Sequence, residues 1–347
     1  MLPKTSSQGW FFIIDSSIQM GLQKCVLVLG VKPQNLKDNF CPTFEHIEPL
    51  ALKPLYSTRG EIIKTVLDEA SEKIGGQPIS IISDAGADLG RGIRLFLEGK
   101  TNVIHSLDIS HRINLCLKKE LKKDENWKLF QTKAGKCVQY LKLSTIAHLC
   151  PPRQRLQERM HNSFPIIEWG LQLINYLQNK AQELSKELKD KISWIVEYED
   201  SLKIYQSLMR LSKTALKYAH EKGYYRGIEE DFMKESEEVM SIRCIEFREK
   251  IKMILQEEGR KIPDGQNYLG SSEIIESVFG RFKRMEGHHA SSGLTSMILG
   301  MPALMGEIDE KEIERAMSVS TIDVKKWLQD NMGPSFLSLR RRDLQSV

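Results

Sequence analysis

The sequence lacks the features that mark several large classes of protein. Its 347 residues include six cysteines, and no two of them form a C-x-x-C pair, which argues against a zinc site of that kind. No uncharged stretch approaches the roughly 20 residues that a membrane helix needs. The polar start, and an apolar run that Asp15 interrupts, do not have the pattern of a secretory signal. We therefore expect a cytoplasmic protein and no membrane partner.

The overall composition is that of a globular protein. Hydrophobic residues make up 41% and charged residues 28% of the chain, which suffices for a sizeable core in one large or two ordinary domains. The formal net charge is +4. Such a mild basic excess permits nucleic-acid binding without establishing it, and an ordinary solvated surface explains it equally well.

The first third of the chain alternates between strand-like and helix-like segments. Short apolar runs predict strands at Trp10–Ile14, Cys25–Val31, Glu48–Tyr56, Ile79–Ser83 and Asn102–Leu107. Helical spacing of apolar residues predicts helices at Glu61–Ile74, Gly90–Glu98 and His111–Leu121. Three strands in a meander, followed by helix-linked parallel strands, predict an α/β fold with a mixed five-stranded sheet and flanking helices.

The strand signal disappears in the middle of the chain. Residues 122–262 contain long stretches rich in Leu, Lys, Glu and Gln, and we predict that they form a large all-helical insertion. The α/β domain then consists of a first part, residues 1–121, and a second part, residues 263–347. We expect the second part to be helical, with a basic end.

Two aspartates stand where predicted strands run into loops. Asp15 follows the first strand, and Asp84 follows the fourth. The carboxyl ends of strands are the usual place for chemistry in open α/β sheets, and two carboxylates there can share hard divalent cations such as Mg²⁺. For either residue alone, capping a helix or starting a turn is the more ordinary role.

A helix predicted within Ser271–Met285 supplies a third candidate acid. Its apolar face consists of Ile275, Val278, Phe279 and Phe282. Glu276 and Lys283 lie two turns apart on one flank of that face, whereas Glu273 is expected to point to solvent. We therefore expect Glu276 to reach a metal held by the sheet and Lys283 to touch a nearby phosphate. The alternative is a surface Glu and Lys at the rim of a core helix.

Three short segments, taken together, point to a family. FFIIDSS at Phe11–Ser17, IISDAGADL at Ile81–Leu89 and SSEIIESVFGRFK at Ser271–Lys283 resemble the three catalytic blocks of bacterial insertion-sequence transposases of the DDE type. The resemblance spans about Trp10 to Leu304. It implies an RNase-H-like catalytic domain, with an all-helical insertion between the fifth strand and the last catalytic helix. It also implies metal-dependent cleavage and transfer of DNA strands during transposition.

The catalytic residues of the family carry over onto three positions of this chain. Asp15, Asp84 and Glu276 match the metal-binding triad. The implied cofactors are two Mg²⁺ or Mn²⁺ ions, with Asp15 bridging both, Asp84 completing one site and Glu276 the other. Asp108 and His111 resemble an accessory pattern, Cys or Asp followed after two residues by His, that several transposase superfamilies have after the second Asp. His111 can equally be a polar residue that follows a helix cap at Ser110.

Basic residues near these blocks are the candidate DNA contacts. Lys283 matches a DNA-binding lysine of one large transposase group, although the Arg and Tyr of that group correspond to Ser272 and Leu269 here. We expect phosphate contacts from six basic side chains: Lys283, Arg281, Arg284, Arg153, Arg155 and Arg159. The last three enter the insertion, where a solvated loop and helix start explains them as well. Trp169 and Trp194 in the insertion are candidates for stacking on an unpaired base or for helix packing.

Only about nine residues precede the first predicted strand, where such transposases usually carry a helix-turn-helix domain. Recognition of the transposon ends then falls to the insertion and the C-terminal region, or the chain is a truncated, non-catalytic DNA-binding remnant. A nuclease of the same fold without strand transfer is a further alternative. The expected partner is DNA at the nucleoid, both transposon ends and target. The sequence leaves open whether the chain forms a homodimer.

Overall fold

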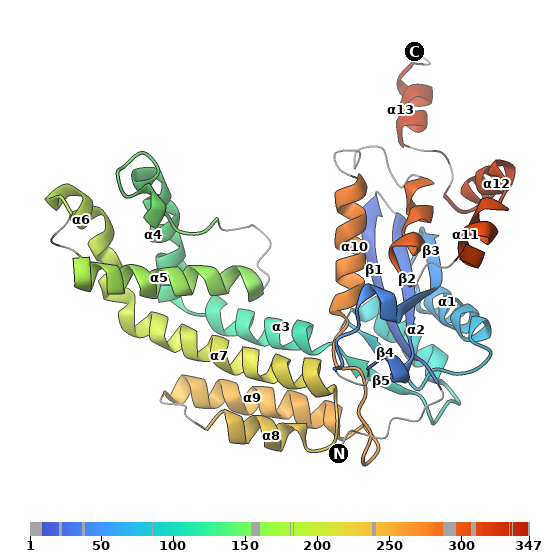
Figure 1. The fold of residues 1–347 in the computed structure, drawn as a ribbon, viewed down its shortest axis with the longest axis horizontal. Helices are drawn as coiled ribbons and strands as arrows, with labels where there is room; N and C mark the ends of the chain where they lie inside the picture. Colours follow the sequence, from blue (N-terminus) through green and yellow to red (C-terminus); the bar gives the residue numbers. More distant parts are fainter. Residues whose placement is uncertain are drawn as a thin grey trace. The chain divides into compact units, whose positions relative to one another are not determined.

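The strands of the first third of the chain form one mixed sheet. The computed structural model describes residues 9–20, 23–36, 39–84, 86–153, 160–180, 182, 184–237, 241–286, 296–306, 310–332, 334 and 336–345. Its strands are β1 (Phe11–Met20), β2 (Gln23–Val31), β3 (Ile47–Leu55), β4 (Ser80–Ser83) and β5 (Ile104–Leu107). Their order is β3-β2-β1-β4-β5; β2 is antiparallel to β1 and β3, whereas β1, β4 and β5 are parallel (Figure 1). The predicted mixed α/β sheet of five strands is confirmed.

The first strand is longer than the sequence indicated. We predicted that it ends at Ile14, but β1 runs on to Met20 and stays paired with β2, where Asp15 lies opposite Leu27. Only the parallel pairing with β4 stops at Ile14, opposite Ser83. The polar residues that follow Ile14 hid the continuation, because the apolar run that marks the strand ends there. Asp15 therefore lies inside β1, beside the end of β4.

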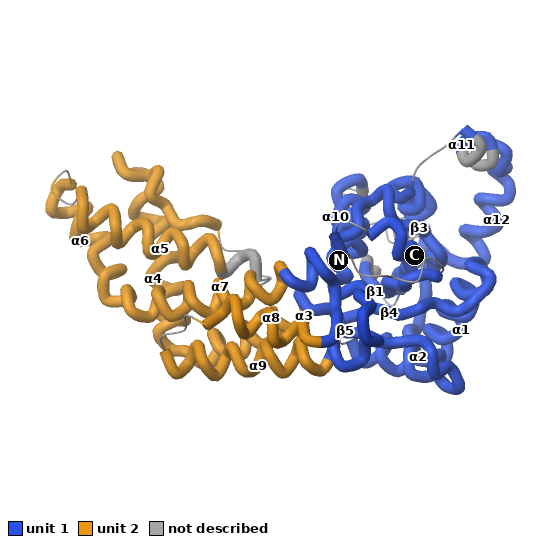
Figure 2. The backbone as a smooth tube through the Cα atoms, turned by 60° about the horizontal axis from the view of Figure 1, so that its bottom comes forward, with its two compact units in different colours: residues 1–110, 218–226, 258–347 blue, residues 111–217, 227–257 orange. Residues whose placement is uncertain are grey.

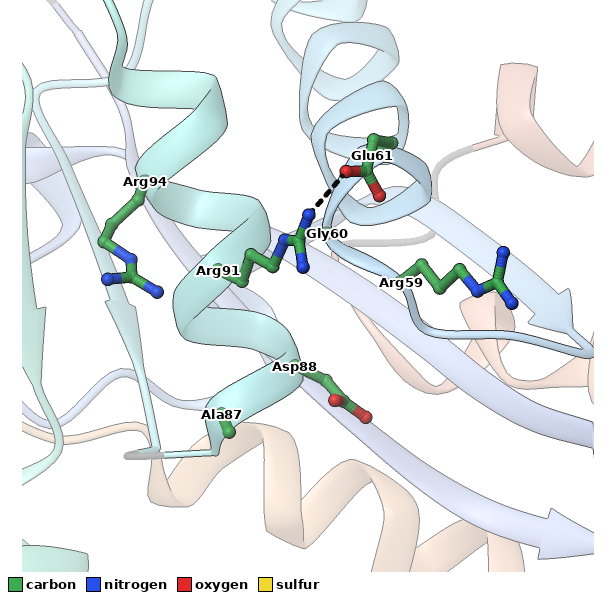
Figure 3. A pocket seen from close by; sticks show the side chains of 7 residues that line it. All are labelled: Arg59, Gly60, Glu61, Ala87, Asp88, Arg91 and Arg94. Atoms are coloured by element: carbon green, nitrogen blue, oxygen red, sulfur yellow. Dashed lines mark hydrogen bonds and ion pairs between the residues drawn. The ribbon is translucent and has the colours of Figure 1, made fainter.

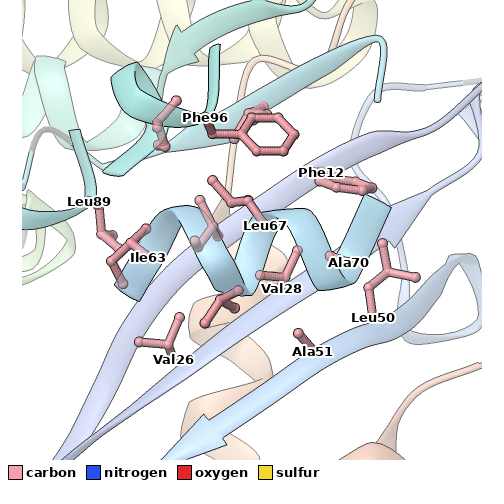
Figure 4. Packing of buried hydrophobic residues seen from close by; sticks show 14 of the residues in the cluster. Phe12, Val26, Val28, Leu50, Ala51, Ile63, Leu67, Ala70, Leu89 and Phe96 are labelled. Carbon is pink, nitrogen blue, oxygen red and sulfur yellow. The ribbon is translucent and has the colours of Figure 1, made fainter. Parts of the chain in front are cut away.

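Two helices cover one face of the sheet. Both α1 (Gly60–Lys73) and α2 (Ala87–Leu97) contribute to a buried cluster with alternate residues of β1 and β2. Phe12 and Val28 of the sheet meet Leu67 of α1 and Phe96 of α2 in this cluster, as Figure 4 shows. Because successive side chains of a strand point to opposite faces, Asp15 points to the other side of the sheet from Phe12.

The opposite face belongs to α10 (Glu273–Glu286), which packs against β1. The four apolar residues predicted to face the core are all buried: Ile275, Val278, Phe279 and Phe282. Further along the chain follow α11 (Glu310–Met317), α12 (Thr321–Met332) and α13 (Phe336–Gln345). The carbonyl oxygen of Met332 accepts hydrogen bonds from the Gln23 amide at 3.0 Å and the Tyr56 hydroxyl at 3.2 Å. These bonds hold the end of α12 beside the β2–β3 edge.

Contacts divide the chain into two units, coloured separately in Figure 2. Unit 1 comprises residues 1–110, 218–226 and 258–347, and unit 2 comprises residues 111–217 and 227–257. Seven described α-helices lie wholly or mostly in unit 2: α3 (Ile109–Lys122), α4 (Glu125–Leu141), α5 (Met160–Lys180), α6 (Lys186–Ile192), α7 (Glu199–Lys222), α8 (Ile228–Glu235) and α9 (Ile242–Gly259). None of the described helices is long and apolar enough to cross a membrane.

Unit 1 includes two short segments that we had placed in the helical insertion. The hydroxyl of Tyr224 donates to the carbonyl oxygen of Leu107 at 2.8 Å, and Glu258 accepts from the Leu107 N–H at 3.3 Å. Both bonds satisfy backbone groups on the outer side of β5, the edge strand of the sheet. The local helix pattern of 218–226 and 258–262 gives no sign of this pairing, so the sequence assigned them to the helices on either side.

Unit 2 has its own aromatic core. Trp169 is buried, and its indole N–H donates to the carbonyl oxygen of Leu149 at 2.8 Å. Trp194 is half-buried and lies edge-on to Tyr198, with ring centroids 5.8 Å apart, and 6.2 Å from Phe130. Both tryptophans therefore take the helix-packing role, one of the two that the sequence left open.

Candidate active site

Three aspartates stand at one level of the parallel strands. The last residues paired across β1, β4 and β5 are Ile14, Ser83 and Leu107. Asp15, Asp84 and Asp108 follow them directly, and the N–H of Asp108 still donates to Ser83 at 2.9 Å. Neighbouring strands lie about 4.8 Å apart. The register therefore brings three acidic residues together that are far apart in the sequence.

Asp15 carries the strongest sign of this crowding. Burial raises its pKa from 3.8 to about 7, and the charge of Asp84 adds to the shift, followed by the charges of Glu276 and Asp108. The N–H of Ser16, which donates to Asp15 Oδ1 at 2.6 Å, opposes the shift. Burial and three neighbouring carboxylates thus dominate the ionisation of Asp15.

Asp84 starts the turn that leads from β4 into α2. Its Oδ1 accepts a hydrogen bond from the N–H of Gly86 at 2.9 Å. A Cβ on Gly86 would lie 2.8 Å from that oxygen, so a larger residue at this position would push the Asp84 side chain away from the N–H. Asp84 therefore does start a turn, as the sequence left open, and it does so through one of its carboxylate oxygens. It also holds the side chain in place at the end of the strand.

Asp108 is buried and fixes the start of α10. One of its oxygens, Oδ2, accepts from the N–H of Ser272 at 2.5 Å and from the hydroxyl of Ser272 at 2.9 Å. Ser272 directly precedes α10, so this bond satisfies one of the backbone N–H groups that a helix start leaves unpaired. The acidic group at the end of β5 therefore determines where the helix that carries Glu276 begins.

The flank of α10 predicted to reach the sheet does face β1. Glu276 is exposed in the first turn, and its charge acts on Asp15. Two turns later, the ammonium group of Lys283 lies 3.1 Å from the hydroxyl of Ser17. Ser17 is two residues after Asp15, and so points to the same face of the sheet. The strand and the helix flank thus form one surface with acids at one end and a lysine further along.

The prediction for Glu273 was wrong. Instead of pointing to solvent, its half-buried side chain accepts from the Ser110 hydroxyl at 2.5 Å and lies 3.5 Å from the ring nitrogen Nε2 of His220. Helical phase within α10 alone could not reveal these partners, because they come from other segments of unit 1. The sequence also missed Ser272 as the anchor of the helix, although a serine pair before an apolar run is a known helix-start signal.

The remaining predicted residues lie in several places. α3 begins at Ile109, so Ser110 cannot be its cap, and His111 lies in the first turn of α3, in unit 2. The Arg281 guanidinium stacks 3.6 Å from the centroid of the Phe44 ring, and Arg284 is exposed on the last turn of α10. Arg153 is exposed in unit 2. The other two arginines of that segment, Arg155 and Arg159, lie outside the described residues.

The described acidic residues offer the carboxylate oxygens that a hard divalent cation binds, but their side chains are not arranged as a metal site. Carboxylate oxygens are the ligands that Mg²⁺ prefers, and the three carboxylates whose charges act on Asp15 favour a cation. Among the residues that the structure describes, however, no three His, Cys, Asp or Glu side chains are arranged as a metal site. The acids share an electrostatic field without forming a closed cage. A bound cation would offset the repulsion between their charges.

The comparisons with known proteins add no relative to this description. No protein-family model matches the chain, and a search of curated proteins finds none that is similar to it. The resemblance of the three short segments therefore stays a prediction, and the register, charges and hydrogen bonds of unit 1 carry the functional interpretation.

Proposed function

We propose that this chain is a DDE-type transposase that cleaves and transfers DNA strands with divalent metal ions, and that unit 1 is its RNase-H-like catalytic domain. One observation carries the proposal: Asp15 and Asp84 directly follow Ile14 and Ser83, the last residues paired between β1 and β4, and the charges of both Asp84 and Glu276 of α10 act on Asp15. These are the same three acids that the short motifs single out. The strand order supports the fold, because a three-stranded meander is continued by helix-linked parallel strands.

The chemistry needs two Mg²⁺ or Mn²⁺ ions, which Asp15, Asp84 and Glu276 would hold. When bound, such ions activate an attacking water or 3′-OH and stabilise the leaving oxygen. The protein supplies the rest. Asp108 sets the start of α10 and so the position of Glu276. Lys283, which lies beside Ser17, would bind a phosphate along β1. Asp15 must lose its proton to bind a cation, so the pH at which the free protein takes up metal reflects its raised pKa.

The test uses supercoiled plasmid and a labelled oligonucleotide with a free 3′-OH. The wild-type protein should nick the plasmid in Mn²⁺ or Mg²⁺ and not in EDTA. Asp84→Asn should abolish nicking, because it removes a carboxylate from the proposed metal site. Asp88→Asn is the matched control, because Asp88 is an aspartate four residues away that lies on α2 and accepts from Thr58 at 2.7 Å. It should keep full activity.

The products separate the enzymatic alternatives. Covalent joining of the labelled oligonucleotide to plasmid indicates strand transfer, as proposed for a protein that acts on transposon ends and target DNA. Nicking without joining, on DNA of any sequence offered, indicates a nuclease. Equal nicking by the wild type and Asp84→Asn would reject this site altogether.

The non-catalytic alternative is a DNA-binding remnant, which would keep the basic surface and need no metal. Calorimetric titration with Mn²⁺ decides between the two, because the enzyme must bind the metal and a remnant need not. Binding that disappears in Asp84→Asn supports the enzyme. DNA binding with no metal uptake supports the remnant.

A further inference from the structure

A second feature of unit 1 is a groove of about 730 Å³ beside the starts of α1 and α2. We call it the basic groove, and its lining residues are Arg59, Gly60, Glu61, Ala87, Asp88, Arg91 and Arg94 (Figure 3). None of these residues was assigned a role in the proposed metal site. Ala87 nevertheless lies only three residues after Asp84, on the helix that Asp84 starts through its bond to Gly86. The groove is therefore next to the acids along the chain.

The floor of the groove is built by close helix packing. A Cβ on Gly92 would come within 2.3 Å of the Cβ of Ile63, and a Cβ on Gly60 within 2.7 Å of the Arg91 Cγ. Glycine at position 92 thus lets α1 and α2 approach closely, whereas a larger residue at position 60 would displace the Arg91 side chain. Two of the lining arginines, Arg91 and Arg94, consequently project from a closely packed helix pair, so that little conformational entropy of the backbone is lost there when a ligand binds.

The charges of the groove leave a positive excess. Arg91 pairs with Glu61 at 2.9 Å, and Asp88 accepts from Thr58 and lies 3.9 Å from the ammonium group of Lys24. Both carboxylates thus already have partners. Arg59 and Arg94 are exposed, and neither has an ion pair among those found in the described part of unit 1. Their two guanidinium groups are available to an anionic ligand.

The spread of the arginines indicates what kind of anion fits. Figure 3 shows Arg94 on one flank of α2, Arg91 between the two helices and Arg59 in the loop before α1. Arg59, whose charge also acts on Glu61, and Arg94 thus lie on either side of Arg91. An extended ligand with repeated negative charges, such as a nucleic-acid backbone, can meet both.

We propose that the basic groove binds successive backbone phosphates of the DNA strand that is held for cleavage. The inference rests on the proposed function, because it takes DNA as the substrate of unit 1. It adds a strand path on the α1–α2 side of the sheet, opposite the face that α10 covers. A free nucleotide or inorganic phosphate offers the same chemistry, and the test includes both.

The experiment measures binding of a fluorescent DNA duplex by anisotropy in EDTA, at several salt concentrations. The variant Arg59→Ala/Arg94→Ala should bind roughly tenfold more weakly at low salt, with a salt slope smaller by about 1.8, since each phosphate contact contributes about 0.9. Arg59→Lys/Arg94→Lys should restore most of the slope, because the charges return. The control is Lys325→Ala/Lys326→Ala, which removes two exposed charges from α12 and should change the slope by less than half as much.

Each other outcome has a defined meaning. Unchanged binding by the arginine variant, or an equal loss in the lysine control, overturns the strand path. Displacement of DNA by millimolar phosphate or nucleotide at constant ionic strength would identify a small-anion site instead. Metal-dependent nicking is measured in parallel: Asp84→Asn should lose nicking at every DNA concentration and keep DNA binding, whereas the arginine variant should need more DNA for half-maximal nicking. The two proposals can therefore fail separately.

Discussion

At the residue scale, the ionisation of Asp15 links the fold to the proposed chemistry. Its pKa is raised from 3.8 to about 7, first by burial and then by the charge of Asp84. Between these two values the folded state holds a proton that the unfolded state has released. Stability from this group is therefore fully present below about pH 4, and it is lost as the pH rises towards 7. A cation bound by the carboxylates would reverse the loss.

The first prediction concerns the stability of Asp15→Asn in the absence of metal. Asparagine has nearly the same shape and no charge, so it removes the titration without creating a cavity. Between about pH 5 and pH 8 the wild type should lose about 3 kcal/mol of unfolding free energy from this group. The variant should lack that component. Urea denaturation at both pH values measures the difference, and added Mn²⁺ at the higher pH should stabilise the wild type only. Identical pH profiles would contradict the raised pKa.

The second prediction separates the two glutamates in the first turn of α10. Glu276 is exposed and acts on Asp15, so Glu276→Gln should abolish metal-dependent nicking and leave thermal stability unchanged. Glu273 accepts from the Ser110 hydroxyl at 2.5 Å. Glu273→Ala should therefore cost about 1–2 kcal/mol of stability, as the loss of a hydrogen bond to a charged group does, and should keep nicking. If nicking is lost in Glu273→Ala and kept in Glu276→Gln, the triad is reassigned.

At the element scale, the buried Asp108 joins the last strand of the sheet to α10. It accepts from both the N–H and the hydroxyl of Ser272, immediately before the helix. At the other end of the flank, Lys283 lies beside Ser17. The helix is thus held to the sheet by polar contacts as well as by its apolar face. Glu276 can adopt a defined position only if these contacts hold the first turn in place.

The third prediction tests this anchor. Asp108→Ala removes a buried cap and leaves the Ser272 N–H unpaired, which should cost about 1–3 kcal/mol. It should also speed hydrogen exchange in the first turn of α10 and reduce nicking. The matched control is Asp124→Ala in unit 2, where Asp124 caps α4 by accepting from the N–H of Asn126 at 2.9 Å. The control should lose comparable stability with no effect on nicking at saturating DNA. Equal losses of nicking in both variants would mean that the anchor has no specific role.

The elements were predictable where local pattern decides them. Strand β4 and helix α1 match their predicted ranges to within about one residue, because turn residues and apolar spacing mark both ends. Strand β1 was cut short at Ile14, because its polar second half is stabilised by pairing with β2. For the same reason Asp15 and Glu276 could be named as candidates from position alone, whereas the partners of Glu273 could not. Contacts between distant segments have no local signal.

At the scale of the whole molecule, the two units differ in what they offer to a substrate. Unit 1 holds the acids in register, Lys283 and the basic groove. The elements that the structure describes in unit 2 are helical, with an aromatic core in which Trp169 and Trp194 pack. The helical character of this region could be predicted from composition. Its limits could not, because Tyr224 and Glu258 bind the edge strand of the sheet in unit 1.

The last prediction assigns DNA binding, and not catalysis, to the basic segment of unit 2. Arg153 is exposed, and Arg155 and Arg159 follow it in the sequence. Changing all three to Ala should reduce the salt slope of DNA binding by up to about 2.7, which corresponds to three phosphate contacts. The rate of nicking at saturating DNA should not change, because the acids of unit 1 are intact. The matched control removes three exposed lysines of the same unit: Lys118, Lys122 and Lys123. Anisotropy titrations at several salt concentrations measure the slope for both variants. An unchanged slope in the arginine variant, or the same reduction in the control, would show that this segment does not bind DNA.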